Sequence, residues 1–233
     1  LWIGSLRREP RVDPWLRAAV AFARMAESGI GAAKHCHNTQ DPDGLLREAE
    51  AVSRAARDVG IRIAFAVPIS DRNPLVYGDA ASLLEGAEPG LRALLEARAR
   101  PRRPWREQLA LVDEVAAFEH PLFQVQYGPV GPQWVSDEAL EAVADASART
   151  GRRVHMHLFE TRLQRDWADA AYPQGLLRAL DGYGLLSPRL TVAHGVWLRP
   201  ADCALMAERG VAVSVNVSSN LRLRSGLPPV ADY

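Results

Sequence analysis

The sequence has few of the features that mark several large classes of protein. Only two of its 233 residues are cysteines, Cys36 and Cys203, and their wide separation is unlike a disulfide framework. No apolar run approaches the roughly 20 residues that a helix needs to cross a bilayer. The first residues, LWIGSLRREPRVDP, lack the continuous apolar segment of a signal peptide. We therefore expect a protein of the reducing cytoplasm without a membrane partner.

The chain also carries no net charge at neutral pH. Lys+Arg and Asp+Glu each number 28, so electrostatics gives no reason to expect nucleic acid as a partner, and a small-molecule substrate is the simpler expectation. Hydrophobic residues make up 48% of a chain that is long enough to bury a substantial core. The chain opens on Leu1 and stops after PPVADY, so we expect the natural protein to be longer at both ends.

An alternation of strand and helix patterns runs along the chain. Short apolar runs rich in β-branched residues predict strands over Gly31–Lys34, Ile61–Val67, Phe123–Tyr127, Arg153–Leu158, Leu190–Ala193 and Val211–Val215. Helical spacing predicts helices over Gly44–Val59, Glu107–Phe118, Asp137–Thr150, Arg162–Tyr183 and Pro200–Arg209. This order implies a parallel sheet with right-handed crossovers, either an open doubly wound sheet or part of an eight-stranded barrel.

Local signals support some of these boundaries. Ser136 followed by two acidic residues is typical of a helix start, and Gly60 and Gly151 are placed where a helix ends before a strand. The segment from Asp79 to Pro104, which ends in ARARPRRP, predicts a helix and an exposed loop inserted in one unit.

Histidines are scarce, yet two of the six lie one residue apart in VHMHLFET, residues 154–161. Because side chains alternate along a strand, His155 and His157 share one face and the apolar residues between them share the other. His157 is nearer the carboxyl end of the strand, where α/β proteins place their chemistry, and Glu160 follows on the loop. This placement favours a functional role for His157 and Glu160.

The next predicted strand, in LTVAHGVWL, ends with His194. Two imidazoles from adjacent parallel strands can bind one metal ion at Zn–N distances of about 2.0–2.1 Å. A carboxylate beside them can then move protons to and from a water activated by the ion. A single histidine at a strand end is more often structural, but His157, Glu160 and His194 together predict a metal-dependent site.

Three stretches, VHMHLFETRLQ, LTVAHGVWL and VSVNVSSNLRLRSGLPPV, resemble the cytosine-deaminase-like or chlorohydrolase-like branch of the amidohydrolase superfamily, from about Ser28 onward. The resemblance implies a (β/α)8 TIM-barrel metallo-hydrolase of the α/β class. The chain would cover roughly strands 2 to 7 as a single partial domain over residues 1–233, without the family's small β-sandwich domain.

The same resemblance implies an activity. It predicts metal-dependent hydrolysis of a carbon–nitrogen bond, with deamination of an amino-substituted heterocycle. One divalent ion, zinc before iron, would be held by His157 and His194, and Glu160 would act as the acid/base.

Parts of the family's pattern are absent from this chain. The His-x-His of the first strand and the aspartate after the eighth are missing, whereas a catalytic zinc normally has three protein ligands. The alternative is a catalytically inactive or incomplete barrel that acts as a binding or scaffold protein. His35-Cys36-His37 could be the first-strand pair, but ARMAESGIG before it resembles the lead-in to the second strand. We expect His35 and His37 to line the pocket or to lie on the loop.

A further departure concerns the substrate. In YGPVGPQWV, Val130 stands where many relatives carry a substrate-contacting histidine, which weighs against a purine or nucleoside recognised through that histidine. Gln126 and Trp134 are the expected substrate contacts. An incomplete barrel leaves strand edges open, so a homo-oligomer is one expectation. A serine hydrolase is disfavoured because no Gly-x-Ser-x-Gly turn is present.

Overall fold

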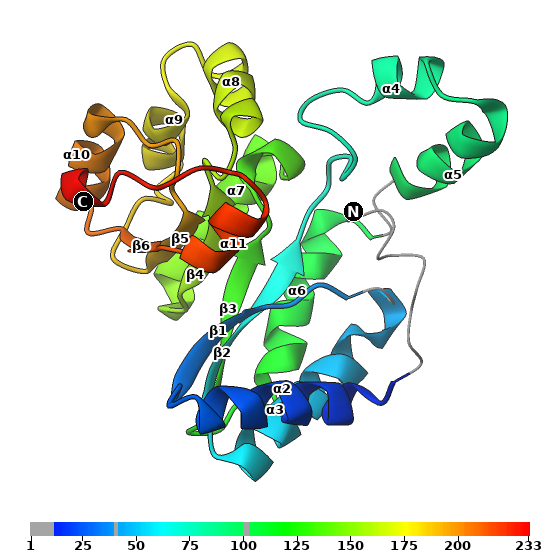
Figure 1. Cartoon of the computed structure of the whole chain (residues 1–233), viewed down its shortest axis with the longest axis vertical. Coiled ribbons are helices and arrows are strands. Elements are labelled where there is room, and N and C mark those ends of the chain that lie inside the picture. Colours follow the sequence, from blue (N-terminus) through cyan, green and yellow to red (C-terminus); the bar gives the residue numbers. More distant parts are fainter. Residues whose placement is uncertain (1–11, 40–41, 100–102) are drawn as a thin grey trace. The chain divides into compact units, whose positions relative to one another are not determined.

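A computed structural model of the chain describes residues 12–39, 42–99 and 103–233 (Figure 1). Within these residues the strands are β1 Ala32–Cys36, β2 Arg62–Ile69, β3 Phe123–Pro129, β4 Val154–Leu158, β5 Leu190–His194 and β6 Ala212–Ser214. The α-helices are α2 Pro14–Glu27, α3 Leu45–Val59, α4 Ala81–Glu85, α5 Pro89–Ala99, α6 Trp105–Ala116, α7 Asp137–Thr150, α8 Arg162–Ala171, α9 Leu176–Gly182, α10 Pro200–Glu208 and α11 Val217–Arg222. Short 3-10 turns are η1 Pro42–Gly44, η2 Pro132–Trp134 and η3 Val230–Asp232.

The strands form one sheet in the order β1-β2-β3-β4-β5-β6. The pairs β1–β2, β3–β4, β4–β5 and β5–β6 are parallel. A doubly wound sheet reverses its order at a switch point, whereas a barrel adds each strand beside the previous one. The sequential order therefore decides between the two folds left open by the sequence, in favour of part of a barrel.

The predicted strands are confirmed, each end to within two residues. The helix predicted over Arg162–Tyr183 is wrong as one helix, because it divides into α8 and α9. Pro173 has no backbone N–H to continue α8, and Gly175 has φ 97°, a left-handed conformation that a glycine adopts without strain. The Asp79–Pro104 insertion contains α4 and α5. Residues 100–102 of its arginine-rich end, and the first eleven residues of the chain, lie outside the described residues.

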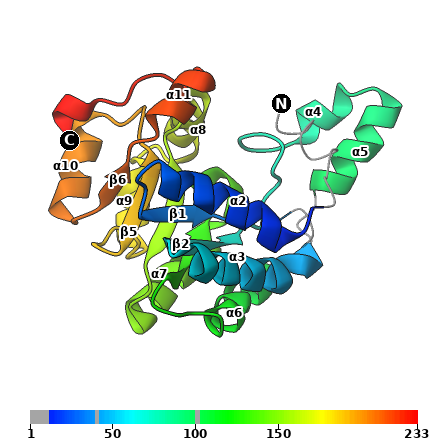
Figure 2. The same cartoon turned by 60° about the horizontal axis from the view of Figure 1, so that its bottom comes forward.

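The chain divides into two compact units, which are described separately. The first consists of the described residues up to Pro68 together with Ala110–Gln126. In it α2 lies beside α3 (Figure 1, Figure 2), and Trp15 Nε1 donates a 2.7 Å hydrogen bond to Asp58. Its core includes apolar side chains of α2, α3, β2 and β3, among them Phe22, Val52, Ala55, Phe65 and Phe123.

The second unit consists of Ile69–Leu109 and Tyr127–Tyr233. The core of this unit includes apolar side chains of β4, β5 and α7, among them Leu140, Val143, Val154, Met156, Leu158 and Val192. Ser136 accepts a hydrogen bond from Ala139 N and Gly151 ends α7 in a left-handed conformation, so both predicted boundaries of this helix are confirmed. Across the described part of the chain, no helix combines the length and apolarity needed to span a membrane.

Candidate active site

The carboxyl ends of β4 and β5 bring two histidine side chains together. The ring centroids of His157 and His194 are 5.5 Å apart, with 30° between the ring planes. His194 is 5% exposed, and His157 is half-buried. The predicted histidine face of β4 is also found, since the ring centroids of His155 and His157 are 5.8 Å apart.

The backbone at the end of β5 makes this meeting possible. The sheet register pairs His157 with Ala193 and Leu158 with His194. In a continued extended strand His194 would thus share the apolar face of Leu158. Its φ of 75° is left-handed instead, which costs about 1–3 kcal/mol for a residue other than glycine and needs support from the surrounding structure. This strained residue places its ring beside that of His157.

Hydrogen bonds between the two loops hold this arrangement. Gly195 N donates to Leu158 O at 3.0 Å, and Trp197 N donates to Phe159 O at 2.9 Å. Gly195 has φ 60°, and a Cβ on it would lie 2.8 Å from the hydroxyl of Tyr233. Tyr233 donates its hydroxyl to Gly195 O at 2.8 Å, so the C-terminal residue fills the space that this glycine leaves.

Each imidazole has its Nδ1 atom anchored by an oxygen acceptor. His157 Nδ1 lies 2.9 Å from Val130 O, and His194 Nδ1 lies 2.7 Å from Asn220 Oδ1. An oxygen acceptor at Nδ1 favours the tautomer with the proton on that nitrogen, which leaves the Nε2 lone pair for a ligand. Burial, and then the charge of His194, lower the pKa of His157, which also favours the neutral ring that metal binding needs.

Glu160 lies beside these rings. Its Oε2 atom is 3.8 Å from His194 Nε2, too far for a direct hydrogen bond and wide enough for a water or an ion to lie between them. The side chain is 23% exposed, so protons can pass between it and solvent. The structure thus brings together His157, Glu160 and His194, as the sequence predicted.

The donor set fits a divalent metal ion, because both rings present Nε2 and both have the Nδ1 partner typical of histidine ligands. Among the residues that the structure describes, no three His, Cys, Asp or Glu side chains gather into a metal site. The described ranges therefore offer two nitrogen ligands here.

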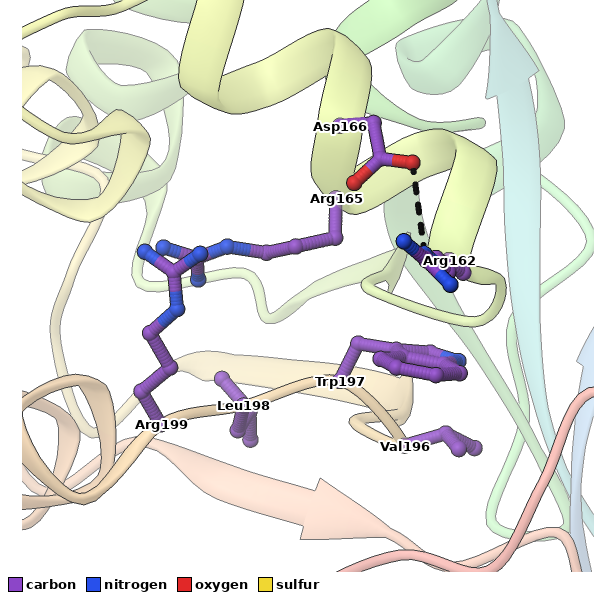
Figure 3. A pocket seen from close by; sticks show the side chains of 7 residues that line it. All are labelled: Arg162, Arg165, Asp166, Val196, Trp197, Leu198 and Arg199. Atoms are coloured by element: carbon purple, nitrogen blue, oxygen red, sulfur yellow. Dashed lines mark ion pairs between the residues drawn. The ribbon is translucent and has the colours of Figure 1, made fainter.

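A separate pocket of about 400 Å³ lies between α8 and the 196–199 segment (Figure 3). None of the three site residues lines it. Arg165 is nearly buried there and forms ion pairs with Asp202 at 2.6 Å and Asp169 at 2.8 Å. Its guanidinium also lies 4.6 Å from the ring centroid of Phe159, the residue before Glu160. These contacts are those of a structural ion-pair network that supports the site loops.

Gln126 and Trp134, the expected substrate contacts, lie in different units and are described separately. Gln126 is 4% exposed, and its Oε1 has no hydrogen-bond partner among the described residues. Trp134 Nε1 is buried and, within the same ranges, also lacks a partner, while its ring centroid is 5.8 Å from that of Tyr77. A substrate role for either residue stays a prediction.

His35 and His37 form a hydrogen-bonded chain in the first unit. His35 Nε2 lies 3.2 Å from His37 Nδ1, and His37 Nε2 lies 2.7 Å from the carboxylate of Glu48. Burial lowers the pKa of His35 to about 3, with smaller effects from His37 and Arg17. These two imidazoles thus already have polar partners within their own unit.

Two contacts of the site were not predicted as functional. Asn220 is fully buried in α11, and Val130 contributes its carbonyl oxygen rather than its side chain. Asn220 belongs to the SSNL stretch that carried the family resemblance, and that stretch could have indicated a functional role for this residue. A backbone acceptor such as Val130 O leaves no signal in side-chain identity.

Comparison with known proteins supports this description. A family profile described as "Amidohydrolase family" matches residues 14–233. Among curated proteins, a 5'-deoxyadenosine deaminase of Methanoregula boonei is 38% identical over 144 residues, covering 58% of this chain and 32% of that protein. A 5'-deoxyadenosine deaminase of Methanosarcina barkeri is 37% identical over 107 residues, covering 46% and 25%.

Solved structures agree on the fold. An adenosine deaminase from Xanthomonas campestris with bound zinc has a TM-score of 0.72 at 25% identity, covering 95% of this chain and 44% of that one. An atrazine chlorohydrolase from Arthrobacter aurescens, complexed with zinc, has a TM-score of 0.71 at 24% identity, covering 96% and 47%. The predicted incomplete (β/α)8 barrel is confirmed, and the chain spans less than half the length of these relatives.

Proposed function

The chain belongs to the amidohydrolase family, and we propose that the protein containing it removes an amino group from a heterocycle by hydrolysis. The observation that supports this best is the site at the ends of β4 and β5. There two imidazoles have anchored Nδ1 atoms, and the Glu160 carboxylate lies 3.8 Å from His194. An orientation of this kind serves metal binding and proton transfer together.

In this proposal His157 and His194 hold one divalent metal ion, with zinc the first choice because the adenosine deaminase structure named above contains it. When bound, such an ion lowers the pKa of a water ligand towards about 7. Val130 O and Asn220 Oδ1 orient the two rings. The remaining ligands must come from groups other than the pair described here, since catalytic zinc normally has three from protein.

Glu160 is the proposed acid/base. Its carboxylate, 23% exposed, would accept a proton from the water as the water oxygen bonds to the ring carbon, and would donate that proton to a ring nitrogen of the substrate. The second proton of the water would then pass to the amino group, the bond from the ring carbon to that group would break, and ammonia would leave.

For the substrate we propose a nitrogen heterocycle with an exocyclic amino group. The deaminase relatives support this class by name, for this chain shares 33–38% identity with several of them. Val130 lacks the polar side chain through which a ring could be recognised at that position. Gln126 and Trp134, each with an unpartnered buried polar atom among the described residues, are the proposed alternative contacts.

The test uses the full-length protein. Metal content would be measured by elemental analysis, and ammonia release would be followed with 5'-deoxyadenosine, adenosine, guanine and an amino-substituted triazine. We expect close to one divalent ion per chain and release of ammonia from at least one of these compounds. The His157→Ala/His194→Ala variant should lose both metal and activity while it keeps its circular dichroism spectrum.

The alternative is a barrel that binds or scaffolds without catalysis. A full-length protein that stays free of metal when zinc or iron is supplied, and releases no ammonia from these compounds, would support that alternative. If Glu160→Gln releases ammonia at the wild-type rate, Glu160 is not the acid/base. The rest of the proposed function is then unaffected.

A further inference from the structure

Gln164 is a polar residue in a position that normally belongs to an apolar one. It lies in the first turn of α8, is 1% exposed, and is among the largest fully buried side chains of the described residues. A buried amide is tolerated only when its polar atoms are hydrogen-bonded. The partners of Gln164 therefore indicate what the residue is for.

Both polar atoms of Gln164 are used, and they join two different loops. Its Oε1 accepts a hydrogen bond from the backbone N of Glu160 at 2.8 Å. Its Nε2 donates to Oε1 of Gln133 at 2.7 Å. One side chain thus connects the backbone of the proposed acid/base to the segment that follows β3.

Gln133 is itself fixed in place. It is 3% exposed and lies in η2, where its side chain folds over Gly131. A Cβ at position 131 would lie 2.8 Å from the Gln133 amide, so this side chain packs closely over the glycine. The side chain of Gln133 is therefore held in one position by burial and packing.

Helix capping alone does not explain these contacts. Thr161 is the N-cap of α8, and its Oγ1 accepts from Gln164 N at 3.1 Å. In an ordinary capping box the third-position side chain returns to the backbone N–H of the cap residue itself. Gln164 reaches one residue further back, to Glu160, and bonds Gln133 with its other atom, which a cap does not require.

We propose, on the basis of the function proposed above, that Gln164 is a positioning residue that holds the Glu160 loop against Gln133 in the geometry needed for proton transfer. The role requires an amide, which accepts and donates at once. An ionised carboxylate could accept from Glu160 N but could not donate to Gln133. A displacement of about 1 Å in a catalytic group can reduce a rate about 100-fold.

The test compares three glutamine-to-methionine variants of the full-length protein. Gln164→Met removes both bonds at similar side-chain length, and Gln133→Met removes only the far one. Gln108→Met is the control: the half-buried Gln108 side chain also accepts and donates at once, from Ser70 N at 2.9 Å and to the carbonyl oxygens of Ser70 and Arg103, both at 2.7 Å, and none of these partners belongs to the proposed site. The readouts are kcat, KM, metal content, the folded fraction and the hydrogen-exchange rate of the Glu160 amide by NMR.

We expect Gln164→Met to lower kcat about 10–100-fold with KM within about twofold and metal content unchanged, and Gln133→Met to have a smaller effect. The Glu160 amide should exchange about 10-fold faster in Gln164→Met and at the wild-type rate in Gln108→Met. An unchanged kcat, or losses that match the folded fraction and equal those of Gln108→Met, would overturn the proposal.

The exchange measurement separates this inference from the proposed function. If the wild-type protein binds no metal and releases no ammonia, the proposed function fails, and amide exchange alone then decides whether Gln164 holds Glu160. Equal exchange at Glu160 in wild type and Gln164→Met would refute the positioning role even in an active enzyme.

Discussion

The rings of His157 and His194 lie 5.5 Å apart even though the sheet register places Ala193, and not His194, opposite His157. The left-handed backbone at His194 accounts for the difference, since it frees this residue from the alternation of its strand. Because Gly195 follows in the same left-handed region, the two residues form a tight turn at the end of β5.

Gly195→Ala should destabilise the chain more than Gly184→Ala. Both glycines have a positive φ, 60° and 76°, but a Cβ at 184 meets nothing within 4 Å, whereas one at 195 would lie 2.8 Å from Tyr233 Oη. We expect a cost of about 1 kcal/mol at 184 from backbone strain, and roughly 1–3 kcal/mol more at 195 from crowding. Urea unfolding of the two variants measures the difference, and equal midpoints would contradict the close approach of Tyr233.

Asn220→Leu should weaken metal binding in the full-length protein by about 10–100-fold. The substitution removes the oxygen that accepts from His194 Nδ1 at 2.7 Å, and loss of such a partner frees both the tautomer and the ring orientation. Competition with a chelating dye gives the affinity. Asn73→Leu is the control, because it removes an amide that bonds only its own loop, at Leu75, Val76 and Gly78. Equal affinity in wild type and Asn220→Leu would exclude an orienting role.

Arg165→Met should cost about 3–5 kcal/mol of unfolding free energy. The Arg165 side chain is 10% exposed and pairs with Asp202, 17% exposed, at 2.6 Å, so the substitution leaves a largely buried carboxylate without its cation. Arg162→Met is the matched change on the same helix (Figure 3). Its pair with Asp166 is 3.6 Å long and mostly exposed, and its loss should cost at most about 0.5 kcal/mol. Similar chemical-denaturation curves for both variants would show that burial does not distinguish these pairs.

Stability should fall as the pH drops from about 6.5 towards 3, through His35. Burial, then the charges of His37 and Arg17, lower its pKa to about 3, whereas an unfolded histidine has a pKa of about 6.5. Between these values the unfolded chain binds a proton that the folded chain does not, so stability rises with pH in this window. The slope contributed by His35 is at most about 1.4 kcal/mol per pH unit.

His35→Gln should flatten that dependence between pH 6.5 and 4.5, as measured by urea unfolding at several pH values. Glu48 affects the stability in a lower pH range than His35 does. Burial pushes the pKa of its carboxyl up, but the hydrogen bond and charge of His37 and a hydrogen bond from Thr39 outweigh this, so the net pKa is lowered. The stability that this lowered pKa of Glu48 contributes is present above about pH 4.3 and is lost as the pH falls further. An unchanged slope in His35→Gln above pH 4.5 would contradict the shifted pKa of His35.

The secondary structure followed from local patterns to a large extent. The runs IRIAFAV and LTVAH carry enough β-branched residues to define β2 and β5, and the Ser136 and Gly151 boundaries of α7 are set by capping chemistry within a few residues. The Arg162–Tyr183 prediction failed because helical spacing of apolar residues continues across Pro173. The buried side chains of α8 are Gln164, Arg165 and Ala168, whereas α9 buries Leu176, Leu177 and Leu180, so the two helices bury faces of different composition.

The sequence by itself determined the types of residue available for chemistry and their order along the chain: His157 and Glu160 after one strand, His194 after the next. These follow from alternation and from the strand boundaries, which are local properties. Only the tertiary structure decided that the two rings meet, because this depends on the left-handed backbone at His194 and on support from Tyr233 and Asn220, which are distant in sequence. The same is true of Gln164, whose partners, Glu160 and Gln133, are set by how two loops fold against each other.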